Sequence, residues 1–524
     1  MSRERSGITT DLVNGICNAR DAMINPASES DVGILRQTVQ LLLAENERLH
    51  RRLLELTRRL ASAEGHTATQ LELEIMRLQE QLQARTHQLF GASSEKRSRP
   101  EDKPSSTPKP APRGHGPRPQ PQLPIVEVEH PLDAADQMCP SCGGDLQPWD
   151  GQFETAEEID VVERSFRIVR HKRQKYRCGC GSCIETALGP DKLIAGGRYS
   201  VDFAVAVAID KYADHSPLAR QVRAMSRHGL SVDTQTLWDQ LWALSRHLLP
   251  SYEALGPYVR RAEVIGADET SWRLMEKAET TRWWVWALTA PDAVFYRILA
   301  ERSARAAAQV LADYGGIVIA DGYGAYEALR KQQQASGAGP PFTLAACWAH
   351  SRRKFVEAEP NYPEAKAMID LIAELYQADA EAKAGSGADA ITRRRAECAP
   401  ILERMRHWLE TTPALPKSSL GTAIRYTLNL WPGLTRFVAH PGIALDNNAT
   451  ERALRGVAIG RKNHYGSRSL RGTEVAALFY SLIESAKLAG IEPASYLREA
   501  ARRAIRNPGT VTLPHQMLGT TDPA

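Results

Sequence analysis

The sequence predicts a multidomain α+β protein with four successive parts: an N-terminal coiled coil, a small zinc-binding domain, a helical region, and an α/β core with an α-helical insertion. Three observations predict this order: a heptad run near the N-terminus, two close groups of cysteines, and two apolar runs that each lead into an aspartate. A chain of 524 residues is also too long for a single hydrophobic core. The expected boundaries are coiled coil 30–96, disordered Pro-rich basic linker 97–124, zinc-binding domain 125–195, helical region 196–255, core 256–485 with the insertion at about 360–440, and C-terminal helical tail 486–524.

The composition is that of an ordinary soluble protein, with 43% hydrophobic and 24% charged residues. The net charge is only +4, so any nucleic-acid signal must come from local clusters of basic residues. The sequence has neither a run of about 18 apolar residues, as a membrane span needs, nor an apolar signal core at its start. We therefore expect a cytoplasmic protein without a membrane partner.

Residues 35–60 carry side chains at alternating spacings of four and three, which is coiled-coil periodicity. The repeat consists of Leu35, Val39, Leu42, Asn46, Leu49, Leu53, Leu56 and Leu60. A single Asn at an a-type position fixes the register and favours a parallel pair, so we expect a homodimer. The alternative is an amphipathic helix that packs on its own protein. The Pro-, Ser-, Arg- and Lys-rich stretch that follows predicts an extended linker.

Five of the eight cysteines lie between Cys139 and Cys183, and in a reducing compartment such clustering favours metal over disulfide. Cys139 and Cys142 form one tight pair, and a second group begins 36 residues later with Cys178. Two close pairs of thiolates make a tetrahedral structural Zn²⁺ site. In the second group Cys180 and Cys183 have the usual C-x2-C spacing, but Cys178 can take the place of one of them.

Two segments next to the cysteines have features of DNA-binding elements. Between the cysteine groups, basic residues including Arg170, Lys172 and Arg173 follow Glu163 without another acid, which suits a phosphate backbone; a solvated basic face is the alternative. Further on, residues 217–228 predict a helix that ends at Gly229, and Asp233 predicts the cap of a second helix. Two helices around a glycine turn resemble a helix-turn-helix, although a plain helical hairpin fits equally well.

The predicted core begins with an apolar run that ends at Asp268 and continues with a hairpin at residues 282–298. A helix at 303–312 leads to a second apolar run that ends at Asp321, and residues 342–348 predict another strand. This order of strand, hairpin, helix, strand, helix and strand is that of a ribonuclease-H-like fold. The two aspartates would then end adjacent strands, at the edge of the sheet where ligands gather.

A third carboxylate has two candidates. Glu357 lies on a helix directly after the last strand, with 35 residues between it and Asp321. Glu451 is the only acid among six basic residues between positions 451 and 471, which favours a metal ligand beside DNA phosphates over an ordinary surface charge. We prefer Glu451.

Three neighbouring residues are left out of the site. By strand alternation Glu269 points away from Asp268. Trp348 and His350 are expected to be packed core residues.

Several stretches, in this order, resemble the insertion-sequence-66 family of bacterial transposases, in which this chain would be the large transposase subunit. The matching stretches are 88–96, the two cysteine groups, 211–215, 267–270, 321–323, 347–353, 446–452 and 461–463. The resemblance covers nearly everything from about residue 35 to residue 505. It implies an acid triad of Asp268, Asp321 and Glu451, with residues 360–440 as a helical insertion that makes Glu357 a decoy. The second cysteine group departs from the family, whose members commonly show a single pair there.

The resemblance further implies two Mg²⁺ (or Mn²⁺) ions in the active site and structural zinc. Double-stranded DNA would be the partner, both as element ends and as target, so the protein would associate with the bacterial nucleoid. Two small companion transposition proteins are possible further partners. We assign Arg452, Arg455, Arg461 and Lys462 to phosphate contacts near the cut site, against the alternative of a solvated helix face.

Two other functions fit parts of the sequence. A non-catalytic dimeric zinc-containing DNA-binding regulator would need the coiled coil and the cysteines but would have no use for the separated acids. A structure-selective ribonuclease-H-like nuclease would cut DNA without joining ends. Metal-dependent cleavage distinguishes the first from a transposase, and a strand-transfer product distinguishes the second.

Overall fold

The computed structural model describes residues 164–517 except 178–183, 277–278, 338–340 and 384–387, together with Arg51, Glu55 and Glu80. The chain divides into two units, one of residues 1–90 and 168–524 and the other of residues 91–167, and almost all described residues belong to the first. The predicted coiled coil, the linker and the cysteines Cys139, Cys142, Cys178, Cys180 and Cys183 lie outside the described residues. No helix within the described ranges is long and apolar enough to cross a membrane.

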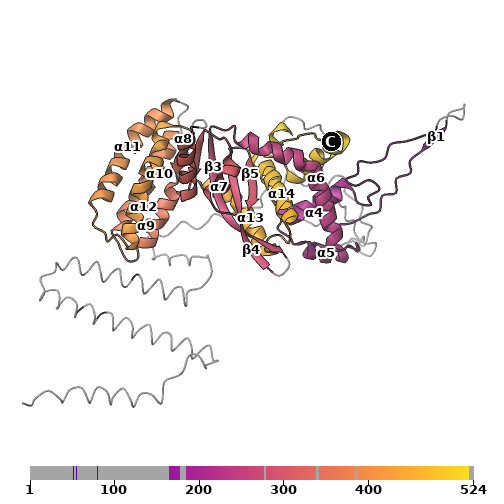
Figure 1. The fold of residues 1–524 in the computed structure, drawn as a ribbon, viewed down its shortest axis with the longest axis horizontal. Helices are drawn as coiled ribbons and strands as arrows, with labels where there is room; N and C mark the ends of the chain where they lie inside the picture. Colours follow the sequence, from indigo (N-terminus) through magenta and orange to yellow (C-terminus); the bar gives the residue numbers. More distant parts are fainter. Residues whose placement is uncertain are drawn as a thin grey trace, which may run out of the picture. The chain divides into compact units, whose positions relative to one another are not determined.

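A mixed sheet of five strands forms the centre of the described part (Figure 1). Its strands are β3 (Val264–Glu276), β4 (Glu279–Thr289), β5 (Val294–Leu299), β6 (Ile317–Ala320) and β7 (Thr343–Ala346), in the order β5-β4-β3-β6-β7. The first three strands are antiparallel, and β6 and β7 run parallel to β3. The parallel strands are short, mostly buried apolar runs, as expected for strands covered on both faces.

The long strand β3 corrects one expectation. Asp268 does not end its strand, because β3 continues through Glu276 in register with β4. Its parallel pairing with β6 does stop at Gly266, two residues before Asp268. Asp268 therefore lies where the parallel half of the sheet ends, although the strand itself goes on as one arm of a long hairpin.

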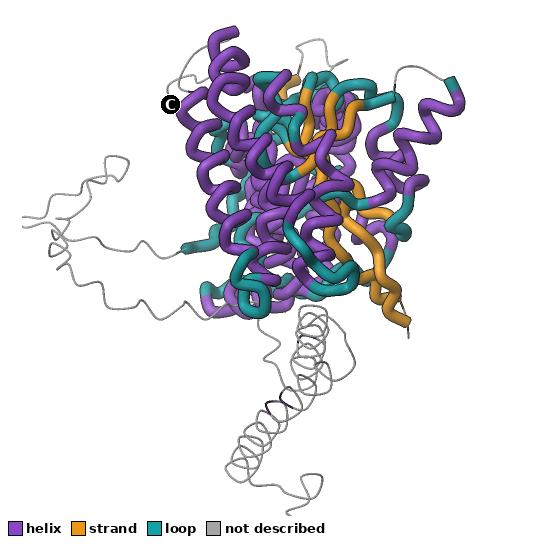
Figure 2. The backbone as a smooth tube through the Cα atoms, turned by 90° about the vertical axis from the view of Figure 1, so that its left-hand side faces the viewer, coloured by secondary structure: helices purple, strands orange, loops and turns teal. Residues whose placement is uncertain are grey.

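Helices cover both sides of this sheet (Figures 1 and 2). On the side of β7 lie α8 (Gly324–Ser336), α9 (Trp348–Ala358), α10 (Ala365–Lys383), α11 (Ala388–Thr411) and α12 (Ser419–Leu434), followed by the short η3 (Arg436–Ala439). A shared hydrophobic core joins α9, α10, α11, α12 and η3 to the sheet, from Ala346 on β7 through Phe355 on α9 to Met405 on α11 and Leu420 on α12.

The helices α10 to α12 occupy the stretch in which the sequence predicts an insertion, and the chain returns from them to the point at which it left the sheet. The Trp348 amide donates to the Leu445 carbonyl (2.9 Å), and the Asn447 amide donates to Cys347 Sγ (3.2 Å). The fully buried Arg394 guanidinium secures the return, since it pairs with Asp379 (2.7 Å) and donates to carbonyls of the segment 437–443.

The remaining elements lie before and after the sheet in sequence. They are β1 (Lys175–Arg177), β2 (Ile184–Thr186), α4 (Val201–Tyr212), α5 (Leu218–Arg227), α6 (Thr234–Val259), α7 (Ala304–Leu311), α13 (Asn448–His464), α14 (Leu470–Leu488), α15 (Pro493–Arg506) and η4 (Pro514–Met517). α5 and α6 lie where the sequence predicts two helices. Gly229 between them has a left-handed φ of 79°, and the Asp233 carboxylate accepts from the Thr236 amide (2.6 Å) as the cap of α6.

Candidate active site

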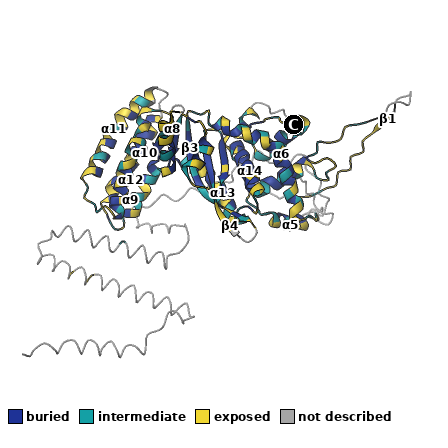
Figure 3. Cartoon of the chain, in the orientation of Figure 1, coloured by how far each residue is buried: buried dark blue, intermediate teal, exposed yellow. Residues whose placement is uncertain are grey.

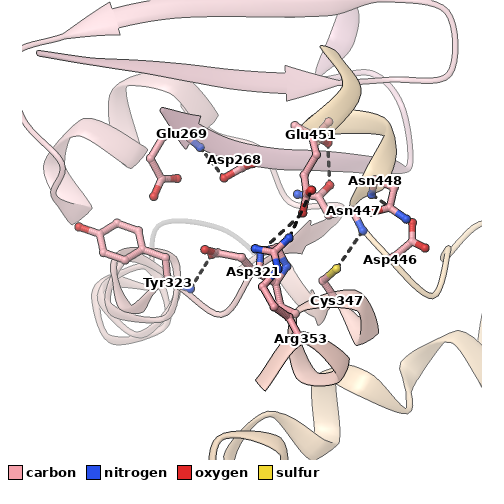
Figure 4. A network of polar contacts seen from close by, with 12 residues as sticks. Asp268, Glu269, Asp321, Tyr323, Cys347, Arg353, Asp446, Asn447, Asn448 and Glu451 are labelled. Carbon is pink, nitrogen blue, oxygen red and sulfur yellow. Dashed lines mark hydrogen bonds and ion pairs between the residues drawn. The ribbon is translucent and has the colours of Figure 1, made fainter. Parts of the chain in front are cut away.

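Three carboxylates from distant parts of the sequence gather at the edge of the sheet (Figure 4). Asp268 projects from β3, Asp321 follows the last residue of β6, and Glu451 lies in the first turn of α13. Burial, followed by the charges of Glu269, Asp321 and Glu451, raises the pKa of Asp268 to about 7, against the hydrogen bond from the Glu269 amide. The structure thus brings together the three acids that the sequence analysis selects.

A buried polar network fixes the start of α13 against β3. Asn447 Nδ2 donates to the Ala267 carbonyl (2.8 Å), and Asn447 Oδ1 accepts from Thr450 Oγ1 (2.6 Å). Thr450 Oγ1 also lies 2.6 Å from the hydroxyl of Thr289 on β4. Gly266 makes this approach possible, because a Cβ there would lie 2.1 Å from Thr450 Oγ1 and 2.6 Å from Asn447 Oδ1.

The later part of α13 is attached to the same strand. Arg461 donates to Thr270 Oγ1 (3.1 Å) and to both the carbonyl and the hydroxyl of Ser271. After the helix, the Ser467 amide donates to the Arg273 carbonyl (3.0 Å), and the Ser467 carbonyl accepts from the Met275 amide (2.8 Å). α13 is therefore held along β3 at its start, near its end and just beyond it. These contacts position Glu451 beside Asp268.

The loop after β6 holds Asp321. The Tyr323 amide donates to Asp321 Oδ1 (2.8 Å), and the Tyr426 hydroxyl donates to the Asp321 carbonyl. Gly322 turns the chain with a φ of 89°, and a Cβ there would lie 2.6 Å from a methyl group of Leu430 on α12. The helical stretch between β7 and α13 therefore contributes directly to the position of Asp321.

His350 lies beside Glu451 and is only partly buried, whereas the sequence predicts a packed core residue. Its Nε2 lies 3.5 Å from Glu451 Oε1, and Arg353 Nη2, one turn further along α9, lies 3.9 Å from Glu451 Oε2. Burial lowers the pKa of His350 and favours the neutral imidazole, in opposition to the nearby carboxylates. Trp348 is a core residue as expected, fully buried, with its Nε1 donating to the Leu434 carbonyl (2.9 Å).

The rival carboxylate, Glu357, lies elsewhere on α9. It is exposed, two turns beyond His350, and it is not among the charges that raise the pKa of Asp268. The buried Glu269 side chain accepts from Arg302 Nε (2.8 Å) and from the Tyr326 hydroxyl (2.9 Å), which hold it away from Asp268. Its charge nevertheless acts on Asp268 and contributes to the raised pKa of that residue.

The chemistry of these donors fits divalent metal ions. Three carboxylates offer hard oxygen ligands, and Glu451 Oε1 is buried without a hydrogen-bond partner in the described part of the chain. A cation would also offset the burial and the repulsion between carboxylates that together raise the pKa of Asp268. Within the described ranges, however, no three Asp, Glu, His or Cys side chains already converge as a metal site, so the carboxylates would have to draw closer around an ion.

Replacing Asp268 by Asn should stabilise the metal-free protein. The ordinary pKa of 3.8 becomes about 7 on folding, so the unfolded chain loses this proton first as the pH rises, and stability falls between about pH 4 and pH 7. At pH 8 Asp268→Asn should therefore raise the free energy of unfolding by roughly 3 kcal/mol, and by less at pH 5. Thermal melts without added Mg²⁺ or Mn²⁺ at both pH values test this, with Glu357→Gln as an exposed control. A lower Tm for Asp268→Asn at pH 8 would contradict the proposed electrostatic cost.

The predicted phosphate contacts on α13 divide into two groups. Arg452, Arg455 and Lys462 are exposed on one stripe of the helix that starts beside Glu451. Arg461 differs from them because its guanidinium is bonded to β3. The other predicted contacts, Arg170, Lys172 and Arg173, are exposed in the segment before β1, where Arg173 Nε donates to the Ala187 carbonyl (2.6 Å).

Two protein-family models match this sequence. The model described as "Transposase IS66 family" matches residues 196–475, which include all three carboxylates, their supporting network and α13. The chain belongs to the IS66 transposase family. The model described as "zinc-finger binding domain of transposase IS66" matches residues 136–181 and supports structural zinc in this family member. That match includes Cys139, Cys142, Cys178 and Cys180 and ends before Cys183.

Three relatives of this IS66 transposase come from Sinorhizobium fredii and carry the description "Uncharacterized protein". The relative y4jD is 30% identical over 403 residues, which are 74% of this chain and 78% of the relative. The relative y4hP is 28% identical over 410 residues, 74% of each chain, and y4qI is 30% identical over 394 residues, 72% of this chain and 71% of the relative. The similarity thus extends over most of each protein. A transposase family also implies that DNA is the partner.

Proposed function

We propose that this chain is a DNA transposase that binds the ends of its insertion sequence and catalyses metal-dependent strand cleavage and strand transfer through Asp268, Asp321 and Glu451. The observation that supports this most directly is the meeting of these three carboxylates beside the basic helix α13. The sheet supports it as well, because its antiparallel hairpin followed by two parallel strands is the arrangement expected of a ribonuclease-H-like core.

The three carboxylates would hold two Mg²⁺ or Mn²⁺ ions. When bound, such ions activate a water or a 3′-hydroxyl as nucleophile and stabilise the leaving oxygen of the phosphodiester. The raised pKa of Asp268 makes it a carboxylate that gains from cation binding. Asn447 positions Glu451 through the start of α13, and the neutral His350 beside Glu451 adds no competing positive charge. No covalent intermediate between enzyme and DNA is required.

The exposed basic residues Arg452, Arg455 and Lys462 would contact phosphates as the DNA passes the carboxylates, and Arg461 would hold the helix that carries them. Arg170, Lys172 and Arg173 would contact DNA outside the core. Because the phosphate backbone attracts Lys and Arg without regard to base sequence, these contacts would supply affinity and register. Recognition of the element ends would need further contacts to the bases.

The N-terminal parts would organise the active complex. Cys139 and Cys142, with two of Cys178, Cys180 and Cys183, would hold a structural Zn²⁺ ion. The heptad run would form a homodimer, which suits an enzyme that must hold two DNA ends. Two small companion proteins remain predicted partners.

Incubation with the DNA ends that flank the gene tests the proposal. Purified full-length protein is mixed with labelled end DNA and a target plasmid, in Mg²⁺, Mn²⁺ or EDTA. We expect cleavage at the ends and joined products, both dependent on metal. Cleavage without joining would indicate the nuclease, and binding without chemistry in any metal, even with the neighbouring gene products added, would indicate the regulator.

A further inference from the structure

The hairpin of β3 and β4 extends well beyond the rest of the sheet. β5 pairs with β4 only from Trp284 to Thr289, whereas β3 and β4 continue to pair as far as Glu276 and Glu279. Figure 2 shows this long strand pair, in orange, reaching to the edge of the helices. Beyond Trp284 the edge of β4 therefore has no neighbouring strand among the described residues, and much of this end of the hairpin is exposed (Figure 3).

Two arginines lie directly opposite each other on this outer half. Arg273 on β3 is the register partner of Arg282 on β4, and both are exposed. Like charges at directly opposite positions of an antiparallel pair are destabilising. Neither guanidinium forms an ion pair with an acid among the residues that the structure describes. The two facing guanidiniums therefore destabilise the free protein, and a bound anion would relieve their repulsion.

The same face carries Glu269 further along β3, whereas Asp268 projects from the opposite face, so the connection to Asp321 runs through Arg302 and Tyr323. The next pair with side chains on this face is Ser271 and Trp284. The Arg302 guanidinium lies over the Trp284 ring at 5.0 Å and over the Tyr323 ring at 4.0 Å. The Tyr323 amide in turn donates to Asp321 Oδ1 (2.8 Å).

The acids at the outer end of the hairpin do not share a face with Arg273 and Arg282. By strand alternation, Glu276 and its register partner Glu279 occupy positions on the opposite face. The buried carboxylate of Glu269 pairs with Arg302 (2.7 Å) and balances that guanidinium only. Arg273 and Arg282 lie further out, beyond its reach. Basic residues interleaved with aromatic rings, as in Arg282-Trp283-Trp284, are typical of surfaces that follow a nucleic-acid strand.

We propose that this face of the hairpin, formed by Arg273, Arg282 and Trp284, binds the phosphate backbone of the DNA that enters the active site past Asp321. The inference rests on the proposed function and adds to it a contact surface distinct from α13. A polyanion fits because a row of phosphates can neutralise two adjacent guanidiniums at once. Tyr323 and Arg302 connect this surface to the carboxylates.

The test compares two double variants of the full-length protein. Arg273→Gln/Arg282→Gln removes the proposed contacts. Arg404→Gln/Arg406→Gln is the matched control, since both arginines lie on α11 and are paired with acids: the exposed Arg404 with Glu374 and the half-buried Arg406 with Glu410. Affinity for a labelled duplex is measured by fluorescence anisotropy over a range of NaCl concentrations without added Mg²⁺ or Mn²⁺, so that binding is read without chemistry and the structural zinc stays in place.

The hairpin variant should bind about tenfold more weakly at moderate salt, and its slope of log affinity against log salt should fall by about 2, one for each lost phosphate contact. The control should keep the wild-type slope. The hairpin variant should also melt at or slightly above the wild-type Tm, because a like-charge pair has been removed. An unchanged slope would overturn the inference, and so would a lower Tm, which would make the arginines structural.

Failure of this inference is distinguishable from failure of the proposed function. A wild-type protein that cleaves DNA, combined with a hairpin variant of unchanged salt slope, would remove only the hairpin surface. A wild-type protein that binds DNA but never cleaves would remove the transposase proposal, while the salt slopes would still decide the hairpin. A protein that does not bind DNA at all would overturn both.

Discussion

Glu451→Gln should reduce metal-dependent DNA cleavage by about 10³-fold or more, whereas Glu357→Gln should leave it within a few-fold of wild type. Gln keeps the shape of the side chain but loses the charge that a divalent ion needs, and a loss of about 4 kcal/mol of transition-state stabilisation corresponds to this factor. Glu451 lies beside Asp268 and His350, while Glu357 is exposed further along α9. Single-turnover cleavage of labelled end DNA measures the difference.

Two further measurements test whether Glu451→Gln affects DNA binding or folding in addition to cleavage. DNA binding without added Mg²⁺ or Mn²⁺ should be similar for Glu451→Gln and wild type, because Glu451 is an acid among bases and is not itself a phosphate contact. Under the same conditions the Tm of Glu451→Gln should not fall, since the substitution removes one of the charges that raise the pKa of Asp268. Loss of cleavage in Glu357→Gln together with full activity in Glu451→Gln would reverse the assignment of the third carboxylate.

Gly266→Ala should damage both stability and activity although glycine and alanine differ by one methyl group. The new Cβ would lie 2.1 Å from Thr450 Oγ1 and 2.6 Å from Asn447 Oδ1, so the start of α13 must move away from β3. Overpacking of this kind costs roughly 1–3 kcal/mol. A displacement of about 1 Å at a catalytic group can lower the rate about 10²-fold, and Glu451 moves with the helix.

The matched control is Gly324→Ala, a glycine at the start of α8 near Asp321. A Cβ at that position meets nothing within 4 Å, so this variant should keep the wild-type Tm and cleavage rate. Thermal melts report the cost of packing, and cleavage rates below the Tm report the displaced carboxylate. A Gly266→Ala protein with wild-type melting and cleavage would show that the contact between β3 and α13 does not position Glu451.

The parts of this structure that could be predicted from the sequence are those with a local cause. The apolar runs before Asp268 and Asp321 are buried strands because a strand covered on both faces must be apolar throughout. The end of α5 at Gly229 and the start of α6 at Asp233 follow from residues that favour a left-handed turn and a helix cap.

Other parts depend on contacts between distant residues and have no local signal. The strand β3 continues past Asp268 because β4 and the segment after α13 pair with it, although its residues there, such as Arg273, are polar. His350 lies beside Glu451 only because α13 returns beside α9. No residue near His350 in the sequence indicates this contact with Glu451. Arg461 belongs to a basic run whose composition does not reveal which member points inward to Ser271.

The attachment of α13 to β3 also has a consequence for how such sites change over evolution and how they can be found in other sequences. Glu451 takes its position from a neighbouring strand, and the stretch that precedes it leaves and rejoins the sheet at one point, beside Cys347 and Asn447. That stretch can therefore change in length without moving Glu451, provided that α12 keeps its contacts with the loop that holds Asp321. In related chains, counting residues from the second aspartate would miss the third carboxylate. A better search pattern is an asparagine four residues before a glutamate, together with a glycine two residues before the first aspartate.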